Sequence, residues 1–281
     1  MQFISTLTLI LSLALGSSAC SEPVQTFWQD DTWLSQTVQH EIDGVIIPET
    51  LVELDNTASG WGQGVNTDEQ NRPLGAVNAQ NRYGQYNAYF ISEPSSTIYL
   101  TLDEGYENGY TAVILDILKE KQCPAVFFVT MDYVKKNPDL IQRMIDEGHV
   151  IGNHSLTHPA AGLPALSMEE QVEEIMAVHR YVEENFGYTM YLFRYPAGIH
   201  SEQSLALVQQ LGYRSVFWSF AYRDWETNNQ PDVAQSLTKV VDCLHPGAIY
   251  LLHAVSSTNT EIMGDFIDQA RAAGYIFGVM E

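Results

Sequence analysis

Two histidines, His154 and His158, stand four residues apart and could bind one metal ion. That spacing lets both rings face the same side, and neutral imidazole is a common metal ligand. Such a pair is also frequent by chance, so it needs a further ligand. A carboxylate from elsewhere in the chain would complete the pattern of catalytic zinc, with one position left for water. The ion lowers the pKa of that water toward about 7 and polarises a carbonyl group.

Other polar residues that could do chemistry stand at or just after the ends of apolar, strand-like runs. They are Asp103, Glu104, His154, Arg194, Asp224 and His253. In a β/α barrel, catalytic groups come from the C-terminal ends of several strands, so these side chains would share one rim. Residues without a common role would be scattered over both ends of the barrel. The shared position of these residues at strand ends is stronger evidence for a site than any one of them alone.

The elements that must position this rim alternate regularly. Apolar, β-rich runs predict strands at 97–103, 124–130, 149–154, 191–195, 214–220, 248–253 and 275–280. Helical spacing and capping residues predict helices at 108–122, 137–148, 167–187, 201–212, 233–241 and 260–274. Alternation implies parallel strands with helical crossovers. The predicted fold class is therefore α/β, a distorted (β/α) barrel of seven to eight parallel strands with an irregular N-terminal extension.

Five short motifs resemble, in this order, those of the NodB-homology polysaccharide deacetylases. They are TLDEGYENGY, NHSLTH, FRYPAG, RDW and YLLH, and the resemblance spans roughly residues 95–281. GYENGYT, EGHVIGNHS, VFWSFAYRDWETNNQ and HPGAIYLLHAVS are similar to one branch, the delta-lactam-biosynthetic de-N-acetylases. That branch removes acetyl from muramic acid in the peptidoglycan of spore cortex. The resemblance implies hydrolysis of N-acetylmuramic acid in peptidoglycan, with N-acetylglucosamine in peptidoglycan or chitin-like chains as the alternative.

The resemblance implies a catalytic role for four residues. Asp103 matches the base that deprotonates the attacking water, and Arg194 matches the arginine that orients it. His253 matches the general acid that protonates the leaving amine, and Asp224 matches the acid that holds this histidine. These roles make chemical sense, because an amide is a poor electrophile and its amine leaves badly unless protonated.

The resemblance also implies a metal and a substrate pocket. His154 and His158 match the metal-binding histidines, and Glu104 stands where the family has its metal-binding Asp. The expected cofactor is a divalent ion, zinc first, with cobalt and manganese as alternatives. Leu251 would line the acetyl pocket. The residues expected to wall the substrate site are Tyr195, Pro196 and Trp225, with a backbone N–H near Tyr195 helping to hold the oxyanion.

The sequence departs from the family at two positions. Glu104 is longer than the usual Asp, or the Asn of the lactam branch, and ligates only if the loop adjusts. Ala197 stands where the lactam branch has a second arginine, which puts muramic specificity in doubt. These departures leave open a third hypothesis, a wall-binding lipoprotein with a decayed site.

The N-terminus predicts export. Residues 1–20 form a short apolar run followed by small residues, typical of a signal peptide, and Cys20 could be a lipidated cysteine. Residues 21–95 form an acidic spacer and extension, and 96–281 the deacetylase domain. We expect a secreted monomer, anchored to the membrane only if Cys20 carries a lipid, and associated with peptidoglycan or a related N-acetylated glycan of the cell wall.

The amino-acid composition excludes nucleic acid as a partner. With 35 acidic and 13 basic residues, the net charge of -22 excludes nucleic acid, whose phosphates would be repelled.

Trp61, in the extension, is expected to pack on the main domain, with sugar stacking as the alternative. His179 and His200 are expected at the surface, and Cys123 and Cys243 as buried free thiols.

Overall fold

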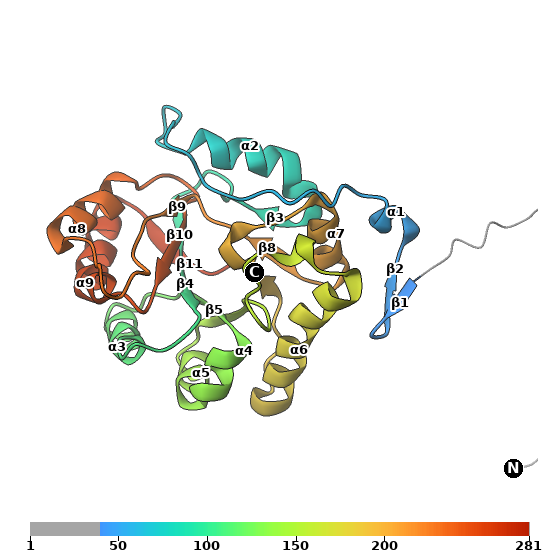
Figure 1. Cartoon of the computed structure of the whole chain (residues 1–281). Coiled ribbons are helices and arrows are strands. Elements are labelled where there is room, and N and C mark those ends of the chain that lie inside the picture. The colour runs from blue at the N-terminus through green and yellow to red at the C-terminus, as the bar shows by residue number, and fades with distance from the viewer. Residues whose placement is uncertain (1–39, 281) are drawn as a thin grey trace, which may run out of the picture. The chain divides into compact units, whose positions relative to one another are not determined.

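The computed structural model describes residues 40–280. The predictions for the signal peptide, Cys20 and the first part of the spacer lie outside these residues. Figure 1 shows a curled sheet in the centre, with helices around its outer side. Within the described part of the chain, none of the helices is long and apolar enough to cross a bilayer.

The elements occur in the predicted alternation. The strands are β1 (His40–Ile42), β2 (Val45–Ile47), β3 (Ala88–Tyr89), β4 (Thr97–Glu104), β5 (Val126–Val129), β6 (Val150–Asn153), β7 (Leu192–Phe193), β8 (Arg214–Val216), β9 (Phe220–Ala221), β10 (Ile249–His253) and β11 (Ile276–Gly278). The helices are α1 (Glu49–Val52), α2 (Leu74–Tyr83), α3 (Thr111–Glu120), α4 (Met131–Lys136), α5 (Pro138–Asp146), α6 (Met168–Phe186), α7 (Glu202–Gln210), α8 (Val233–Asp242) and α9 (Ser257–Ala272). Short 3-10 turns are η1 (Gly84–Tyr86), η2 (Leu163–Ala165) and η3 (Pro196–Gly198).

The main sheet is parallel, as predicted. Its strand order is β3-β8-β7-β6-β5-β4-β10-β9, with β11 also paired to β4. Every recorded pairing within it is parallel, as helical crossovers require. The register aligns Asp103 of β4 with His253 of β10, so two predicted catalytic residues stand opposite each other.

Strand β4 divides its side chains between two environments. Leu100 and Leu102 are fully buried and belong to the large apolar cluster formed with the helices. Because side chains alternate along a strand, Thr101 and Asp103 face the other way, into the curled sheet, where both accept hydrogen bonds from Arg194. Alternation therefore brings Asp103 into the interior of the barrel.

The run predicted as one strand at 214–220 bends instead. Its first part is β8, paired with β7 and β3, and its last part is β9, paired with β10. Side chains bind the carbonyl groups of the bend. Arg194 donates to the carbonyls of Val216 and Phe217 at 3.0 and 3.1 Å, and Trp61 donates to that of Trp218 at 3.0 Å. These side chains satisfy the carbonyl groups of Val216, Phe217 and Trp218, which the ladder leaves without a partner where the chain passes from β8 to β9.

The described part of the extension is built into this fold. Its strand β3 is the edge strand beside β8, and Gln80 of α2 binds the Ala88 carbonyl at 3.1 Å and the Phe90 amide at 2.9 Å. Trp61 packs edge-on against Phe217 of the main domain, with ring centroids 6.2 Å apart, and its Nε1 donates to the Trp218 carbonyl at 3.0 Å. The expected packing of Trp61 on the main domain is confirmed.

Helix α6 begins at the predicted capping residues. The Ser167 hydroxyl accepts the Glu170 amide at 3.2 Å, and the Glu170 carboxylate accepts the Ser167 amide at 2.8 Å. This reciprocal capping box satisfies two amides that the helix leaves unpaired. At the other end, Gly187 adopts the left-handed conformation that terminates a helix, with φ 62°.

Loss of this cap is expected to weaken the fold measurably. Replacing Ser167 by alanine should lower the free energy of unfolding by about 1 kcal/mol, because the Glu170 amide loses its partner. Denaturant unfolding followed by circular dichroism measures the change. Threonine at the same position keeps the hydroxyl and serves as the control; an equal loss in both variants would contradict the capping role.

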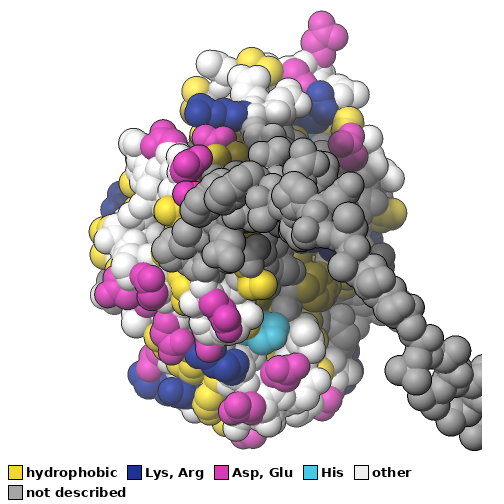
Figure 2. All heavy atoms as spheres, turned by 90° about the vertical axis from the view of Figure 1, so that its right-hand side faces the viewer, with side chains coloured by type: hydrophobic (Ala, Val, Ile, Leu, Met, Phe, Trp, Pro, Cys, Tyr) yellow, Lys and Arg dark blue, Asp and Glu magenta, His cyan; other side chains and the backbone are white. Residues whose placement is uncertain are grey.

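The surface carries the acidity of the sequence. Figure 2 shows Asp and Glu side chains scattered over the face in view, with fewer Lys and Arg between them. Both cysteines are free, as expected, and Cys123 is buried, but Cys243 is only half-buried. The expectation for His200 is wrong: its side chain is buried beneath the extension, and its Nδ1 lies 3.0 Å from the Gly198 carbonyl oxygen.

Candidate active site

A pocket of about 580 Å³ opens among the ends of the strands that the sequence singled out. The residues that line it are Trp61, Gly62, Gln63, Asp103, His154, His158, Tyr195, Ala197, Trp218, Ala221, Tyr222, Arg223, Trp225, Leu251 and His253. Seven of the predicted site residues are therefore brought together: Asp103, His154, His158, Tyr195, Trp225, Leu251 and His253. Arg194 and Asp224 lie directly behind them, each fully buried.

Asp103 is held by a buried arginine. Arg194 Nη1 donates to Asp103 Oδ1 at 2.8 Å and to Thr101 Oγ1 at 2.7 Å, while the Phe128 ring lies 4.1 Å below the guanidinium carbon. Burial alone would raise the pKa of Asp103, but the charge of Arg194, with a further contribution from His253, outweighs it and lowers the pKa. Asp103 is consequently an anion at neutral pH. Arg194 donates to its Oδ1, which leaves Oδ2 available for another partner.

His154 presents a bare nitrogen to the same carboxylate. Its Nδ1 lies 2.9 Å from the Arg194 carbonyl oxygen, so Nδ1 must carry the proton of the neutral ring. Burial is the main cause that lowers the pKa of His154 to about 4, which keeps the ring neutral at pH 7. Its Nε2 lone pair then faces Asp103 Oδ2 at 3.5 Å. A cation could be bound by these two atoms together, the Nε2 of His154 and the Oδ2 of Asp103.

His158 lies next to this nitrogen on a tightly held loop. The rings of His154 and His158 have centroids 4.8 Å apart. His158 has φ 52°, a left-handed conformation that non-glycine residues rarely adopt. Glu174 of α6 binds the Thr157 amide at 2.9 Å and its hydroxyl at 2.5 Å. Glu174 was not predicted as a site residue, although an acidic residue on the buried face of a predicted helix is a usable signal.

The structure places Glu104 apart from the other predicted ligands. Its side chain is fully buried, does not line the pocket, and has no hydrogen-bond partner for either carboxylate oxygen. Burial, reinforced by the charges of Glu107 and Asp103, raises the pKa of Glu104 well above its usual value. Within residues 40–280, no three His, Cys, Asp or Glu side chains already form a metal-binding group.

His253 faces Asp103 from β10 and is held by Asp224. His253 Nδ1 lies 2.8 Å from Asp224 Oδ1, and the His253 amide donates to Asp224 Oδ2 at 2.8 Å. Burial would lower the pKa of His253, but the Asp224 charge and hydrogen bond, helped by Asp103, raise it above 6.5. Because Nδ1 is engaged by Asp224, Nε2 of the protonated ring can donate its proton to a group in the pocket.

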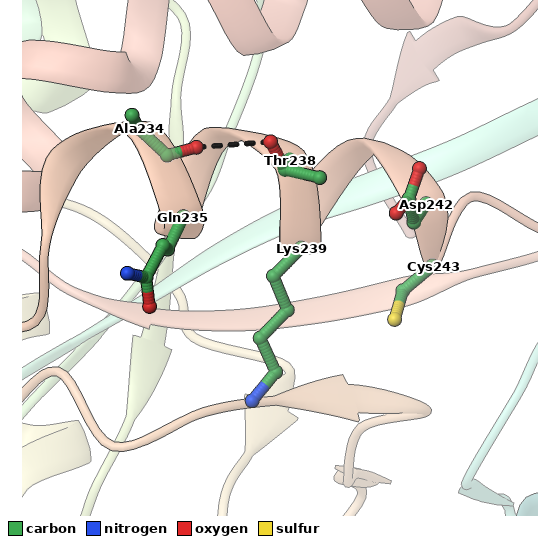
Figure 3. A pocket seen from close by; sticks show the side chains of 6 residues that line it. All are labelled: Ala234, Gln235, Thr238, Lys239, Asp242 and Cys243. Atoms are coloured by element: carbon green, nitrogen blue, oxygen red, sulfur yellow. Dashed lines mark hydrogen bonds between the residues drawn. The ribbon is translucent and has the colours of Figure 1, made fainter.

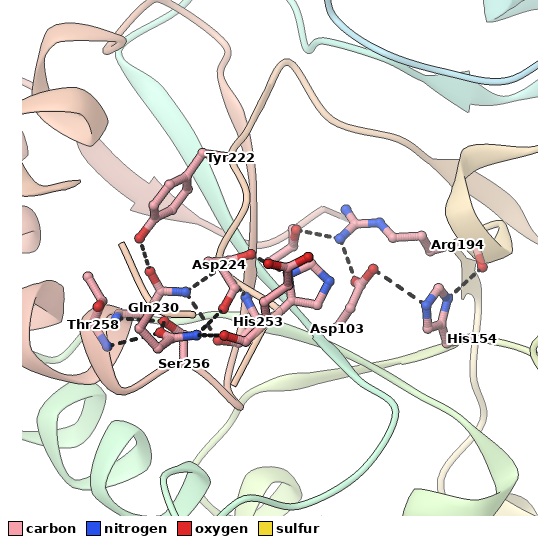
Figure 4. Close-up of polar contacts among 12 residues, drawn as sticks. Asp103, His154, Arg194, Tyr222, Asp224, Gln230, His253, Ser256 and Thr258 are labelled. Atoms are coloured by element: carbon pink, nitrogen blue, oxygen red, sulfur yellow. Dashed lines mark hydrogen bonds and ion pairs between the residues drawn. The ribbon is translucent and has the colours of Figure 1, made fainter. Parts of the chain in front are cut away.

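A network behind the pocket fixes Asp224 itself (Figure 4). Asn259 of α9, fully buried, donates to Asp224 Oδ2 at 2.5 Å and to the His253 carbonyl at 3.1 Å. The Tyr222 hydroxyl donates to the Asn259 side-chain oxygen, and Gln230 donates to the Asp224 carbonyl at 2.7 Å. Neither residue was predicted from the sequence: Asn259 lies outside the quoted motifs, and Gln230 ends the stretch VFWSFAYRDWETNNQ without a chemical role assigned to it.

The pocket walls are largely apolar. The Trp225 ring lies 5.6 Å from that of His253, and Leu251 lines the pocket beside it. Pro196 is buried at the start of η3 and does not line the pocket. After Ala197, the backbone at Gly198 has φ 68°, and a Cβ there would lie 2.8 Å from the Trp218 ring, so only glycine fits.

A second hollow, of about 450 Å³, lies over α8 and lacks this convergence. Its side chains spread along the helix, and Figure 3 shows one hydrogen bond among them, from the Thr238 hydroxyl to the Ala234 carbonyl at 3.0 Å. The residues that line it are Ala234, Gln235, Thr238, Lys239, Asp242 and Cys243. They offer no acid and base aimed at one point, so the chemistry belongs to the pocket around Asp103.

Comparison with known proteins agrees with this geometry. Residues 91–216 match the family described as polysaccharide deacetylase. The peptidoglycan-N-acetylmuramic acid deacetylase PdaA of Bacillus subtilis strain 168 is 43% identical over 195 residues, which cover 69% of this chain and 73% of the relative. An uncharacterised 30.6 kDa protein of Geobacillus stearothermophilus is 41% identical, covering 81% of this chain and 86% of its own.

A solved structure extends the likeness to the fold. The structure of Bacillus subtilis PdaA, a family 4 carbohydrate esterase, superposes with a TM-score of 0.75 at 38% identity, covering 80% of this chain and 95% of the other. The predicted parallel barrel-like sheet and the predicted resemblance are both confirmed. The chain belongs to the polysaccharide deacetylase family, whose members hydrolyse the amide bond of N-acetylated sugars.

Proposed function

We propose that the chain removes the acetyl group from N-acetylmuramic acid in peptidoglycan outside the cytoplasm. The observation that carries the proposal is the pairing of a carboxylate base, Asp103, with a histidine acid, His253, across one pocket. The relative named for this reaction supports the choice of sugar. The signal-like residues 1–20 support export, with Cys20 as a candidate site of lipid attachment.

The attack begins at Asp103. Its anionic carboxylate accepts the proton of the water that adds to the acetyl carbonyl carbon. Arg194 keeps Asp103 charged and fixes its orientation through Oδ1, which leaves Oδ2 for the water. The backbone N–H of Tyr195, a residue that lines the pocket, donates to the oxyanion that forms on the acetyl oxygen.

The reaction ends at His253. Its imidazolium donates a proton to the sugar nitrogen as the carbon–nitrogen bond breaks, so that an amine rather than an amide anion leaves. Asp224 keeps this proton on His253 by raising its pKa. Leu251 and Trp225 line the pocket beside His253 and limit the entry of bulk water around the acetyl group.

A divalent metal ion, zinc in the first place, fits beside these residues. His154 and His158 would hold it. The ring of His154 is neutral and is oriented by the Arg194 carbonyl at Nδ1, which leaves its Nε2 free to bind the ion. When bound, the ion supplies Lewis acidity to the acetyl oxygen and acidity to a water. Glu104 would be a third ligand only if the end of β4 adjusts, because its buried, unpartnered carboxylate does not line the pocket.

Replacing Glu104 by glutamine tests this ligand. We expect zinc affinity, measured by chelator competition, to fall at least about tenfold. In the metal-free protein we expect higher stability at pH 7, because the raised pKa of Glu104 marks a penalty for its ionised form. This gain should vanish as the pH falls to the pKa that Glu104 has in the unfolded chain. Unchanged zinc affinity would leave Asp103 as the carboxylate at the metal.

One observation favours a second sugar. Ala197 lines the pocket where the muramic-specific branch has an arginine, so this position offers no positive charge to a lactyl carboxylate, and Arg223, which also lines the pocket, pairs with Glu226. A neutral N-acetylglucosamine unit would fit such a wall. Mass spectrometry of products from amidase-treated peptidoglycan, intact peptidoglycan and chito-oligosaccharides separates the two. Deacetylated muramic acid supports the proposal, free glucosamine units alone favour the alternative, and no acetate from any glycan with added zinc would favour a binding protein.

A further inference from the structure

The N-terminal extension forms part of the wall of the active-site pocket. Trp61, Gly62 and Gln63 line the pocket together with Asp103 of β4 and His253 of β10. None of these three extension residues takes part in the proton transfers proposed above. Their place in the pocket therefore calls for another role.

The Gln63 side chain uses both ends of its amide. Its Oε1 accepts the Trp218 Nε1–H at 3.1 Å, and its Nε2 donates to the Ala221 carbonyl at 3.1 Å. Trp218 lies in the bend between β8 and β9, and Ala221 is the last residue of β9. Turning the amide over would place a donor against a donor and an acceptor against an acceptor, so its orientation is fixed. Gln63 therefore links the bend to the strand that follows it.

Trp218 is held at its backbone as well as at its indole. Trp61 donates to the Trp218 carbonyl at 3.0 Å, so the extension binds both parts of the residue. The ring has little room to move, because a Cβ at Gly198 would lie 2.8 Å from it. Although Trp218 lines the pocket, only 8% of it is exposed.

The same bend holds the arginine behind the catalytic base. The carbonyls of Val216 and Phe217, the two residues before Trp218, accept hydrogen bonds from Arg194 at 3.0 and 3.1 Å. The guanidinium carbon also lies 6.0 Å from the centre of the Trp218 ring. Arg194 in turn donates to Asp103 Oδ1 at 2.8 Å. A shift of the bend would therefore move the group that orients Asp103.

We propose that Gln63 is a positioning residue of the deacetylation reaction. Gln63 fixes Trp218, the bend that contains Trp218 fixes Arg194, and Arg194 fixes Asp103. The rate is sensitive to such contacts, because a misplacement of about 1 Å can cost on the order of 100-fold. This role rests on the proposed function and places part of the control over its base in the extension.

The kinetics of Gln63→Leu, Trp218→Phe and the double variant test this role. Leucine keeps most of the bulk of Gln63 without its amide, and phenylalanine keeps a ring without the N–H. We expect Gln63→Leu to lower kcat for acetate release about tenfold and to leave KM within about twofold, because the chemical step depends on Asp103. In the Trp218→Phe background, Gln63→Leu should cost less than about twofold more, since the bond through which it acts is already absent.

Gln80→Leu is the matched control. Gln80 is a second glutamine of the extension with both ends of its amide bonded, to the Ala88 carbonyl at 3.1 Å and the Phe90 amide at 2.9 Å, but it does not line the pocket. Its substitution should lower the melting temperature and leave kcat and KM, measured well below unfolding, at wild-type values. An equal fall of kcat in this control would show that any loosening of the extension lowers activity, which overturns a specific role for Gln63.

The double variant distinguishes positioning from contact with the substrate. Losses that multiply in the double variant, a loss confined to KM, or a wild-type kcat in Gln63→Leu would each overturn the positioning role while the deacetylase function stands. A wild-type protein that releases no acetate from any glycan overturns the proposed function and this role with it. Melting temperatures of all variants, measured beside wild type, show whether the fold is intact at the assay temperature.

Discussion

Asp103→Asn is expected to reduce kcat/KM for acetate release by a factor of at least about 10³. Asparagine has the same shape and can still accept the hydrogen bond that Arg194 donates to Oδ1 at 2.8 Å. It cannot accept a proton from water, so general-base catalysis is lost. Steady-state acetate release at a temperature well below unfolding measures the effect. Activity within tenfold of wild type would contradict the role of Asp103 as the base.

The same substitution should also destabilise the protein. Arg194 is fully buried, and Asp103 is the one anion recorded as its ion-pair partner within the described chain. Removing that charge leaves a buried guanidinium uncompensated, at a cost of about 3–5 kcal/mol. Thr101→Val is the matched control, because it removes another hydrogen bond of Arg194 and keeps the charge pair. We expect this control to lose stability while its activity stays within about tenfold of wild type.

The alternation of elements could be predicted from the sequence because each element has its own local signal. The apolar run 97–103 became β4, and the capping box at Ser167 marks the start of α6 in the structure. The bend at 217–219 could not be predicted, since it depends on donors from Arg194 and Trp61, far away in the chain. Local patterns show which residues favour a strand, but not which distant side chains take the place of the hydrogen bonds from a neighbouring strand.

The rim of the site could be predicted for the same reason. Parallel strands place their C-terminal ends on one edge, so residues at those ends meet whatever their separation in sequence. The direction of a side chain is a different matter. Asp103 and Glu104 are neighbours at the end of β4, yet only Asp103 lines the pocket. A shared strand end predicts proximity, and alternation then separates adjacent residues.

The supporting residues were invisible because they carry no motif of their own. Glu174 and Asn259 lie on helices and act on Thr157 and Asp224 through tertiary contacts. His200 was expected at the surface, but its side chain is buried beneath the extension. In each case burial is decided by a segment distant in sequence. A polar residue at an apolar helical position is the one signal that could have been used.

Asp224→Asn is expected to move the alkaline limit of activity toward lower pH. His253 must be protonated to serve the leaving amine, and Asp224 is the main partner that raises its pKa above 6.5. Without that charge, burial and the charge of Arg194 lower the pKa again, opposed only by Asp103. The variant should therefore keep most activity at acidic pH and lose progressively more as the pH rises, by about tenfold above the pKa for each unit by which the pKa of His253 falls. A pH profile of kcat/KM measures the shift.

The shift has to be separated from a general loss of negative charge near the pocket. Glu226→Gln removes the same charge two residues away, on a side chain that pairs with Arg223 and does not line the pocket. Its pH profile should coincide with that of wild type, since Glu226 does not contribute to the pKa of His253. A uniform loss in Asp224→Asn at every pH would show that Asp224 acts by positioning His253 alone. An unchanged profile would show that another group donates the proton, because a histidine that lost its anionic partner cannot hold that proton to the same pH.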